Sequence, residues 1–166
     1  MKYLSIILFF IPLMINAQEL SKNIEKSTVE YRELFLEKNF EKLSNFASPK
    51  LIEHLKTKQD LVYLLTQLNK NAELKGTKVI NLTFGKNSEI VNYKNQLQCS
   101  IPFNLEMENV KQKVTFMAGL ALISFDKGET WYFTFKVEKD QKMNNEVLDL
   151  DSNIIIAERT QSIINK

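Results

Sequence analysis

Two side chains of this sequence could do catalytic or metal-binding chemistry, but neither has a suitable partner near it along the chain. His54 is the sole histidine and lies in the segment LIEHLK between apolar neighbours. One histidine makes a poor metal site, because protein zinc sites usually use three or four ligands. Cys99 is the sole cysteine and lies on the apolar side of an alternating segment, where a thiol behaves as a small hydrophobic side chain. We therefore predict no catalytic residue, no metal site and no cofactor.

A third group, close to the C-terminus, has the spacing of a calcium-binding loop. Asp149, Asp151 and Asn153 occupy alternate positions, but such a loop needs glycine at its sixth position and glutamate at its twelfth. The sequence has Ile154 and Thr160 there, so we exclude a calcium site. The four glycines of the chain are dispersed, which also excludes a glycine-rich phosphate loop.

The segment ISFDKGETWYF, residues 123–133, contains an acidic residue whose surroundings indicate a turn. An apolar strand enters it and an aromatic strand leaves it, which predicts a β-hairpin. Asp126 can accept hydrogen bonds from backbone N–H groups of its own turn. Gly128 can supply the positive φ that such a loop needs. We expect Asp126 to stabilise the turn rather than to perform chemistry.

This hairpin resembles the Asp-box, the Ser-x-Asp-x-Gly-x-Thr-Trp hairpin that is repeated on the blades of sialidase-like propellers. The matching residues are Ser124, Asp126, Gly128, Thr130 and Trp131. In those families the box is a folding device that lies away from the catalytic centre. A propeller needs several blades of about 40 residues each, and one copy in a chain of 166 residues cannot build one. The resemblance therefore implies a structural turn and no glycosidase activity.

The elements that would position these residues change character near Gly76, from a helical to a β-strand period. Before it, apolar residues recur at helical spacing and predict a helix over residues 19–38, followed by a short helical stripe. Ser48 with Pro49 begins a further helix, because the serine can cap it and proline suits its first position. Thr57 begins the longest of the later helices, whose expected buried stripe is Leu61, Leu64, Leu65 and Leu68.

After Gly76 the apolar residues alternate, which is typical of strands. The clearest strand covers residues 97–107, where six apolar residues alternate with polar ones. Residues 114–125 are apolar on both faces, which predicts a central strand covered on both sides for part of its length. Residues 130–137 form the next expected strand. For residues 146–166 two alternatives remain open, a short strand near residues 154–156 or a docked tail.

The order of these elements looks like the cone-shaped fold of nuclear-transport-factor-two-like proteins and cystatin-like folds. The stretch FLEKNFEKLSNFASPKLIEHL, residues 35–55, is similar to the opening of many secreted members. The resemblance implies an α+β fold in which N-terminal helices pack on a curved antiparallel sheet and leave a pocket between them. The candidate pocket residues are Tyr31, His54 and Tyr63.

Residues 2–17, KYLSIILFFIPLMINA, have the pattern of a signal peptide. A lysine precedes an apolar run that ends in a small residue, so we predict cleavage between Ala17 and Gln18. The run is shorter than the roughly 20 residues of a membrane span, and we expect no stable membrane anchor after cleavage. The prediction is one α+β domain over residues 18–166, exported to the periplasm or secreted. With one cysteine it forms no intrachain disulfide, so packing must hold the fold.

Charge and site composition narrow the expected function. The formal net charge is +2 with mixed signs along the chain, which does not predict nucleic-acid binding. We expect an exported non-enzymatic binding or accessory module, with an unknown small ligand in a pocket or a partner protein on the sheet. The alternatives are a small pocket enzyme of the isomerase or dehydratase kind and an inhibitor or immunity-type interaction protein. A homodimer remains open.

Overall fold

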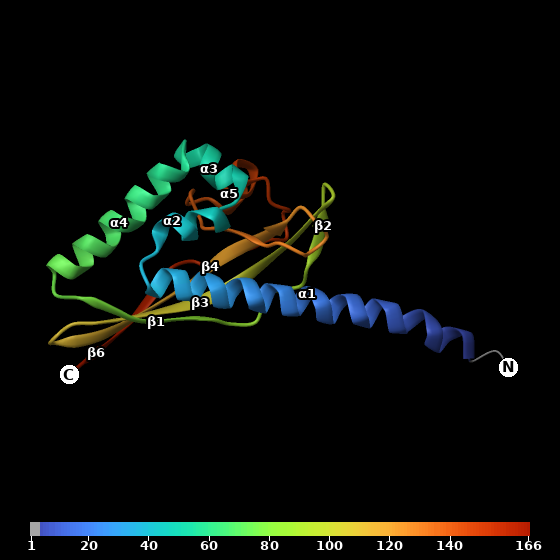
Figure 1. Cartoon of the computed structure of the whole chain (residues 1–166), viewed down its shortest axis with the longest axis horizontal. Helices are drawn as coiled ribbons and strands as arrows, with labels where there is room; N and C mark the ends of the chain where they lie inside the picture. Colours follow the sequence, from blue (N-terminus) through green and yellow to red (C-terminus); the bar gives the residue numbers. More distant parts are fainter. Residues whose placement is uncertain (1–3) are drawn as a thin grey trace.

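The computed structural model describes residues 4–166, with side chains from residue 18 onward, and most of its helices precede its strands (Figure 1). The helices are α1 (Leu4–Leu36), α2 (Phe40–Leu43), the 3₁₀ turn η1 (Ser44–Phe46), α3 (Pro49–Leu55), α4 (Lys58–Leu74) and α5 (Gln141–Leu148). The strands are β1 (Lys78–Phe84), β2 (Val91–Tyr93), β3 (Gln96–Glu108), β4 (Gln112–Ser124), β5 (Tyr132–Thr134) and β6 (Thr160–Asn165). The α+β class predicted from the sequence is confirmed.

The starts of α3 and α4 follow local sequence chemistry. The Ser48 hydroxyl accepts a hydrogen bond from the backbone N–H of Leu51 at 3.2 Å, and Pro49 occupies the first turn of α3. The Thr57 hydroxyl accepts one from the backbone N–H of Asp60 at 3.1 Å. Both side chains satisfy N–H groups that a helix start leaves without partners. The two predicted caps are therefore confirmed.

Helix α1 begins earlier than the predicted helix over residues 19–38. It runs from Leu4 to Leu36, and its N-terminal part extends beyond the sheet (Figure 1). The predicted signal peptide, residues 1–17, lies outside the residues whose side chains the structure describes, so it remains a prediction. No helix in the described part of the chain is both long and apolar enough to cross a membrane.

A long antiparallel hairpin of β3 and β4 forms the centre of the sheet. Their pairing extends from Leu97 opposite Ser124 to Glu108 opposite Lys113. β1 and β2 pair with opposite ends of β3, and β6 and β5 pair with opposite ends of β4. Each long strand thus has two short neighbours, and the sheet curls around the helices (Figure 1). This confirms a curved antiparallel sheet with residues 114–125 at its centre.

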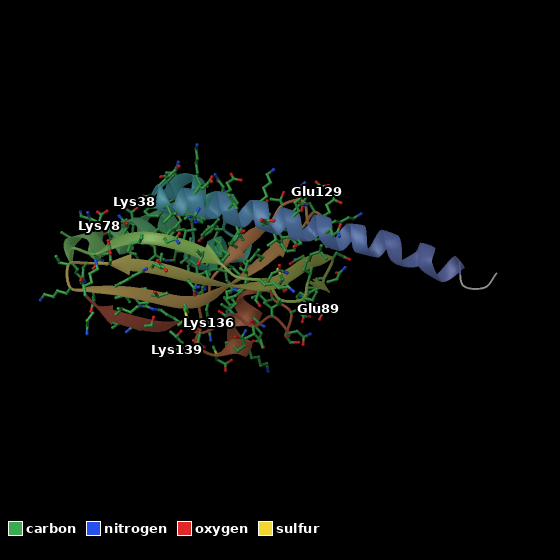
Figure 2. All side chains as sticks on the ribbon, turned by 90° about the horizontal axis from the view of Figure 1, so that it is seen from below. Lys38, Lys78, Glu89, Glu129, Lys136 and Lys139 are labelled. Carbon is green, nitrogen blue, oxygen red and sulfur yellow. The ribbon has the colours of Figure 1, made fainter. Side chains whose placement is uncertain are left out.

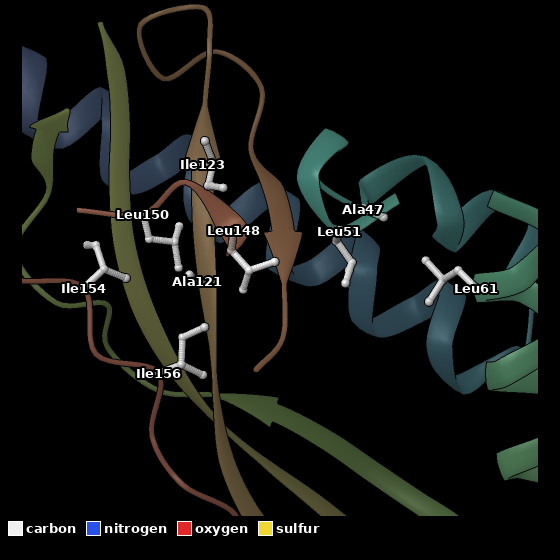
Figure 3. Close-up of a cluster of buried hydrophobic side chains, with 9 residues drawn as sticks. All are labelled: Ala47, Leu51, Leu61, Ala121, Ile123, Leu148, Leu150, Ile154 and Ile156. Atoms are coloured by element: carbon white, nitrogen blue, oxygen red, sulfur yellow. The ribbon is translucent and has the colours of Figure 1, made fainter. Parts of the chain in front are cut away.

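Both faces of β4 contribute to the core, as its apolar pattern predicted. On one face Leu120 and Leu122 pack with residues of α1 and β3, among them Ile24 and Ile101. On the other face Ala121 and Ile123 belong to a second cluster (Figure 3). That cluster also contains Ala47, Leu51, Leu61, Leu148, Leu150, Ile154 and Ile156.

The C-terminal part contains two elements that sequence periodicity did not reveal, α5 and β6. α5 is a short helix capped by Asp140, whose carboxylate accepts a hydrogen bond from the N–H of Met143 at 2.9 Å. Residues 154–156 form no strand but a docked extended segment, with Ile154 and Ile156 buried. β6 is held in the sheet by backbone pairing with β4. All six of its residues are exposed. A strand without a buried face has no alternating pattern to detect.

Candidate functional site

A cavity of about 420 Å³ lies between helices α1, α2 and α4 and the inward face of β1, β3 and β4. Most of its lining is apolar, with Phe35, Leu65, Leu105, Met107 and Phe116 among the contributing side chains. Volumes of about 300–1,000 Å³ with an apolar lining and a few polar groups are typical of small-molecule sites. The cavity is the strongest candidate site in the described part of the chain.

The position of α4 creates this space. Leu61, at the start of the helix, is 4% exposed, but Leu68, two turns later, is 58% exposed and lines the cavity. The expected buried stripe is therefore wrong at Leu68. α4 packs against α2, η1 and α3 and then runs above the sheet toward β1 (Figure 1). Its C-terminal half thus presents apolar side chains to the cavity instead of filling it.

Tyr31, one of the three candidate pocket residues, lies in the lining. Its ring stacks on Phe133 at 4.6 Å between centroids and meets the ring edges of Phe84 and Phe46. Burial raises the pKa of its hydroxyl to about 12. Within the residues that the structure describes, this hydroxyl has no hydrogen-bond partner, so it offers a polar group to a ligand.

The other two candidates lie elsewhere. His54 is exposed on α3, and Tyr63 is 67% exposed on α4. Neither lines the cavity. Tyr63 lies two positions from both Leu61 and Leu65, which places it on the outer side of a helix whose buried side those leucines define. Of the three candidates, Tyr31 is the one that lies in the lining of this cavity.

Two cationic side chains in the lining were not among the sequence candidates. Lys38, at the end of α1 (Figure 2), forms an ion pair with Glu73 of α4. The hydrogen bond from Lys38, with a further one from Asn69 at 3.0 Å, lowers the pKa of the Glu73 carboxyl. Arg159 reaches the cavity from the segment before β6. No local motif marks Arg159, because the pairing of β6 with β4 places it there.

The hairpin at Asp126 is a second, separate cluster of polar groups. Asp126 Oδ1 accepts hydrogen bonds from the Ser124 hydroxyl at 2.8 Å and from the backbone N–H of Thr130 at 2.9 Å. The Ser124 hydroxyl accepts one from the N–H of Gly128 at 2.8 Å, whose φ is +95°. Trp131, the last matching residue, is 1% exposed. These contacts all close the turn itself, and the structural role of Asp126 stays a prediction.

Burial and hydrogen bonding act in opposite directions on the pKa of Asp126. Partial burial alone raises it, but the hydrogen bonds from the backbone and hydroxyl of Thr130 and from Ser124 favour the ionised form. Together they lower the pKa below its ordinary value. A carboxylate held in its ionised form by its own turn is suited to structure rather than to proton transfer.

The described residues contain no group of three or more His, Cys, Asp or Glu side chains that could hold a metal ion. Asp151 accepts hydrogen bonds from the backbone and side chain of Asn153 at 2.8 and 2.9 Å. Asp149 ends α5 in a left-handed conformation and pairs with Lys94. The Asp151 carboxylate therefore serves its own turn, and the Asp149 carboxylate serves a long-range ion pair. Burial raises the pKa of the Cys99 thiol to about 12, which leaves it in the unreactive neutral form.

Comparison with known proteins finds no family model, no curated protein and no solved structure that matches this chain.

Proposed function

We propose that this chain is an exported binding module of the nuclear-transport-factor-two-like type that holds a small, mainly apolar ligand in the cavity beneath α4. The observation that carries the proposal is the largely apolar lining of that cavity, in which Leu68 is 58% exposed. Apolar surface left in contact with water costs about 25 cal/mol per Å². A ligand that covers the lining recovers this free energy, and the Tyr31 hydroxyl can orient it.

A fluorescence titration with the neutral apolar dye N-phenyl-1-naphthylamine tests the proposal. We expect the wild-type protein to enhance the dye's emission with saturation. Ala72 lines the cavity, so Ala72→Trp fills it and abolishes the enhancement. Thr66→Trp is the matched control, since Thr66 is exposed on the same helix and does not line the cavity. Equal dye binding by both folded variants, or none by the wild type, would refute the proposal.

Export is supported by the charged start, apolar run and small terminal residue of residues 2–17. The prediction is a mature chain that begins at Gln18 in the extracytoplasmic fraction. Intact mass measurement of the protein purified from that fraction tests it. A full-length chain that stays with the cytoplasm would contradict export without affecting the binding proposal.

The alternative, a small pocket enzyme, would need an acid–base pair in the cavity. The lining contains no Asp, Glu or His, and Glu73, which contacts Lys38 of the lining, is held in that ion pair. General acid–base catalysis needs a group whose pKa lies near the working pH. The pKa of Tyr31, about 12, is far above neutrality. The geometry therefore favours binding over catalysis.

Association through β6 is the second candidate, and it fits a partner protein or a second copy. β6 is an edge strand that pairs with β4 on one side. Ile163 and Ile164 on it are 51% and 64% exposed. An exposed edge with apolar side chains can add a strand from another chain. Native mass spectrometry tests the homodimer: Ile164→Lys should dissociate it, and a wild-type monomer at every concentration excludes it.

A further inference from the structure

The lining of the cavity includes a cationic side chain, Arg159, whose backbone is held in place by contacts with β4. The Gly119 N–H donates a hydrogen bond to the carbonyl oxygen of Ala157 at 3.1 Å, and Thr160 pairs with Met117. These contacts hold the chain on both sides of Arg159 against the edge of β4. A Cβ atom at position 119 would lie 2.6 Å from the Ala157 nitrogen. The close approach that positions Arg159 therefore depends on glycine.

The Arg159 guanidinium lies over an aromatic ring of the cavity lining and retains its hydrogen-bonding capacity. Its Cζ lies 4.4 Å from the centroid of the Phe116 ring, and both side chains line the cavity. An aromatic face supports a guanidinium from one side and leaves its N–H groups free to bind an anion. Among the described residues, no carboxylate lies within 4.0 Å of Arg159 and no hydrogen bond uses its side chain.

Two carboxylates that could compete for the cations of the lining, Glu158 and Glu73, already form ion pairs. Glu158, adjacent in sequence, forms an ion pair with Lys136, and Figure 2 shows Lys136 on the side of the sheet away from α1. Lys38, the other cation of the lining, is neutralised by Glu73. The lining of the cavity contains no acidic residue, so no carboxylate within the cavity itself neutralises Arg159.

We propose that the ligand is a single-chain amphipathic anion, with its alkyl chain in the cavity and its anionic head group on Arg159. This inference rests on the proposed binding function and adds the chemical class of the ligand. The apolar lining takes the chain, and the exposed position of Arg159 keeps the head group at the solvent boundary. A planar guanidinium fork matches carboxylate and phosphate oxygens, which makes alkyl carboxylates and alkyl phosphates the two fitting head-group classes.

Displacement of N-phenyl-1-naphthylamine by four amphipaths of equal chain length tests the inference: dodecanoate, dodecyl phosphate, dodecanol and dodecyltrimethylammonium, all below micelle formation. We expect at least one anion to displace the dye at about tenfold lower concentration than dodecanol. The cationic amphipath should compete least well. Added salt should weaken dye displacement by the anion and leave displacement by dodecanol unchanged.

Arg159→Gln should remove the anion's advantage over dodecanol, measured as the ratio of their displacing concentrations within each variant, and Arg159→Lys should restore part of it. Lys142→Gln is the charge-matched control, because Lys142 lies on α5 outside the cavity. Equal competition by anion and alcohol would overturn the inference while the binding function stands. An unchanged advantage of the anion over dodecanol in Arg159→Gln would do the same. Failure of the dye itself to bind would instead refute the binding function.

Discussion

Asn23 of α1 and Gly128 of the β4–β5 hairpin are joined across 105 positions of sequence. The Asn23 Nδ2 donates a hydrogen bond to the Gly128 carbonyl oxygen at 2.9 Å. A Cβ atom at Gly128 would lie 1.9 Å from Leu20 Cδ2, so the hairpin lies directly against the helix. The Arg32 Nε donates to the carbonyl oxygen of Leu82 in β1 at 2.8 Å. These two contacts fix α1 at separate places on the sheet, and the cavity begins beside the second.

Gly128→Ala should destabilise the protein more than a glycine substitution at a turn normally does. The alanine would adopt a φ of +95° and collide with Leu20, and strained backbone of this kind costs about 1–3 kcal/mol before any clash. Gly76→Ala is the control, because its φ is +67° but nothing lies within 4 Å of the new Cβ. Urea unfolding of both variants measures the difference. Equal losses would mean that the hairpin does not pack on α1.

Asp126→Ala should lower the free energy of unfolding by about 1 kcal/mol at neutral pH, through loss of hydrogen bonds at an exposed turn. The folded pKa of Asp126 is lowered, so its contribution is present above the unfolded pKa of about 3.9 and is lost as pH falls through the folded value. Thermal melts at neutral and acidic pH should therefore converge for wild type and variant. Asp126→Asn keeps an acceptor oxygen and should lose less. Unchanged melts at neutral pH would make the Asp-box match coincidental.

Gln98→Leu should cost about 2–4 kcal/mol, because two backbone groups lose their buried partner. The Gln98 side chain is fully buried. Its Nε2 donates to the Asp149 carbonyl oxygen at 3.0 Å, and its Oε1 accepts from the Asp151 N–H at 2.8 Å. Ser100→Leu, on the same side of β3 but partly exposed, is the control. Urea midpoints decide the outcome, and a neutral Gln98→Leu would show that the C-terminal segment is not held through this residue.

The Cys99 thiol of the folded protein should react slowly with thiol reagents. At alkaline pH the free energy of unfolding should fall, because the unfolded thiol ionises more readily than the buried one. Its folded pKa is raised from 9.0 to about 12, so its contribution is complete below the unfolded value and is lost as pH rises from about 9 to 12. Urea midpoints should therefore fall over this range, and less steeply in Cys99→Ala. Rapid modification of the native thiol at neutral pH would contradict its burial.

Periodicity and cap chemistry were enough to predict much of the fold. The helical stripe around Ile24, the caps at Ser48 and Thr57, and the alternating run through Cys99 and Ile101 are all local signals. Each element buries one face or satisfies its own terminus, so its type can be read from neighbouring residues. The doubly apolar strand at residues 114–125 likewise indicated burial on both sides.

The C-terminal part and the cavity could not be predicted in this way. Asp149 and Asp151 stand out in the sequence for the spacing of a calcium loop, yet their backbone groups bind the buried Gln98 side chain. Tyr31 and Tyr63 have similar helical surroundings, but one lies in the cavity and the other is exposed. The orientation of a helix on a sheet decides between them, and that orientation depends on contacts far apart in the chain.

The sequence by itself thus determined the α+β class, the order of most elements and the chemistry of the turns, because these depend on residues within a few positions of one another. Only the tertiary structure decided where the candidate cavity lies. The path of α4 over the sheet leaves the lining unfilled, and the pairing of β6 with β4 brings Arg159 to its mouth. Both result from long-range packing, in which the free energy depends on residues that meet only after the chain has folded.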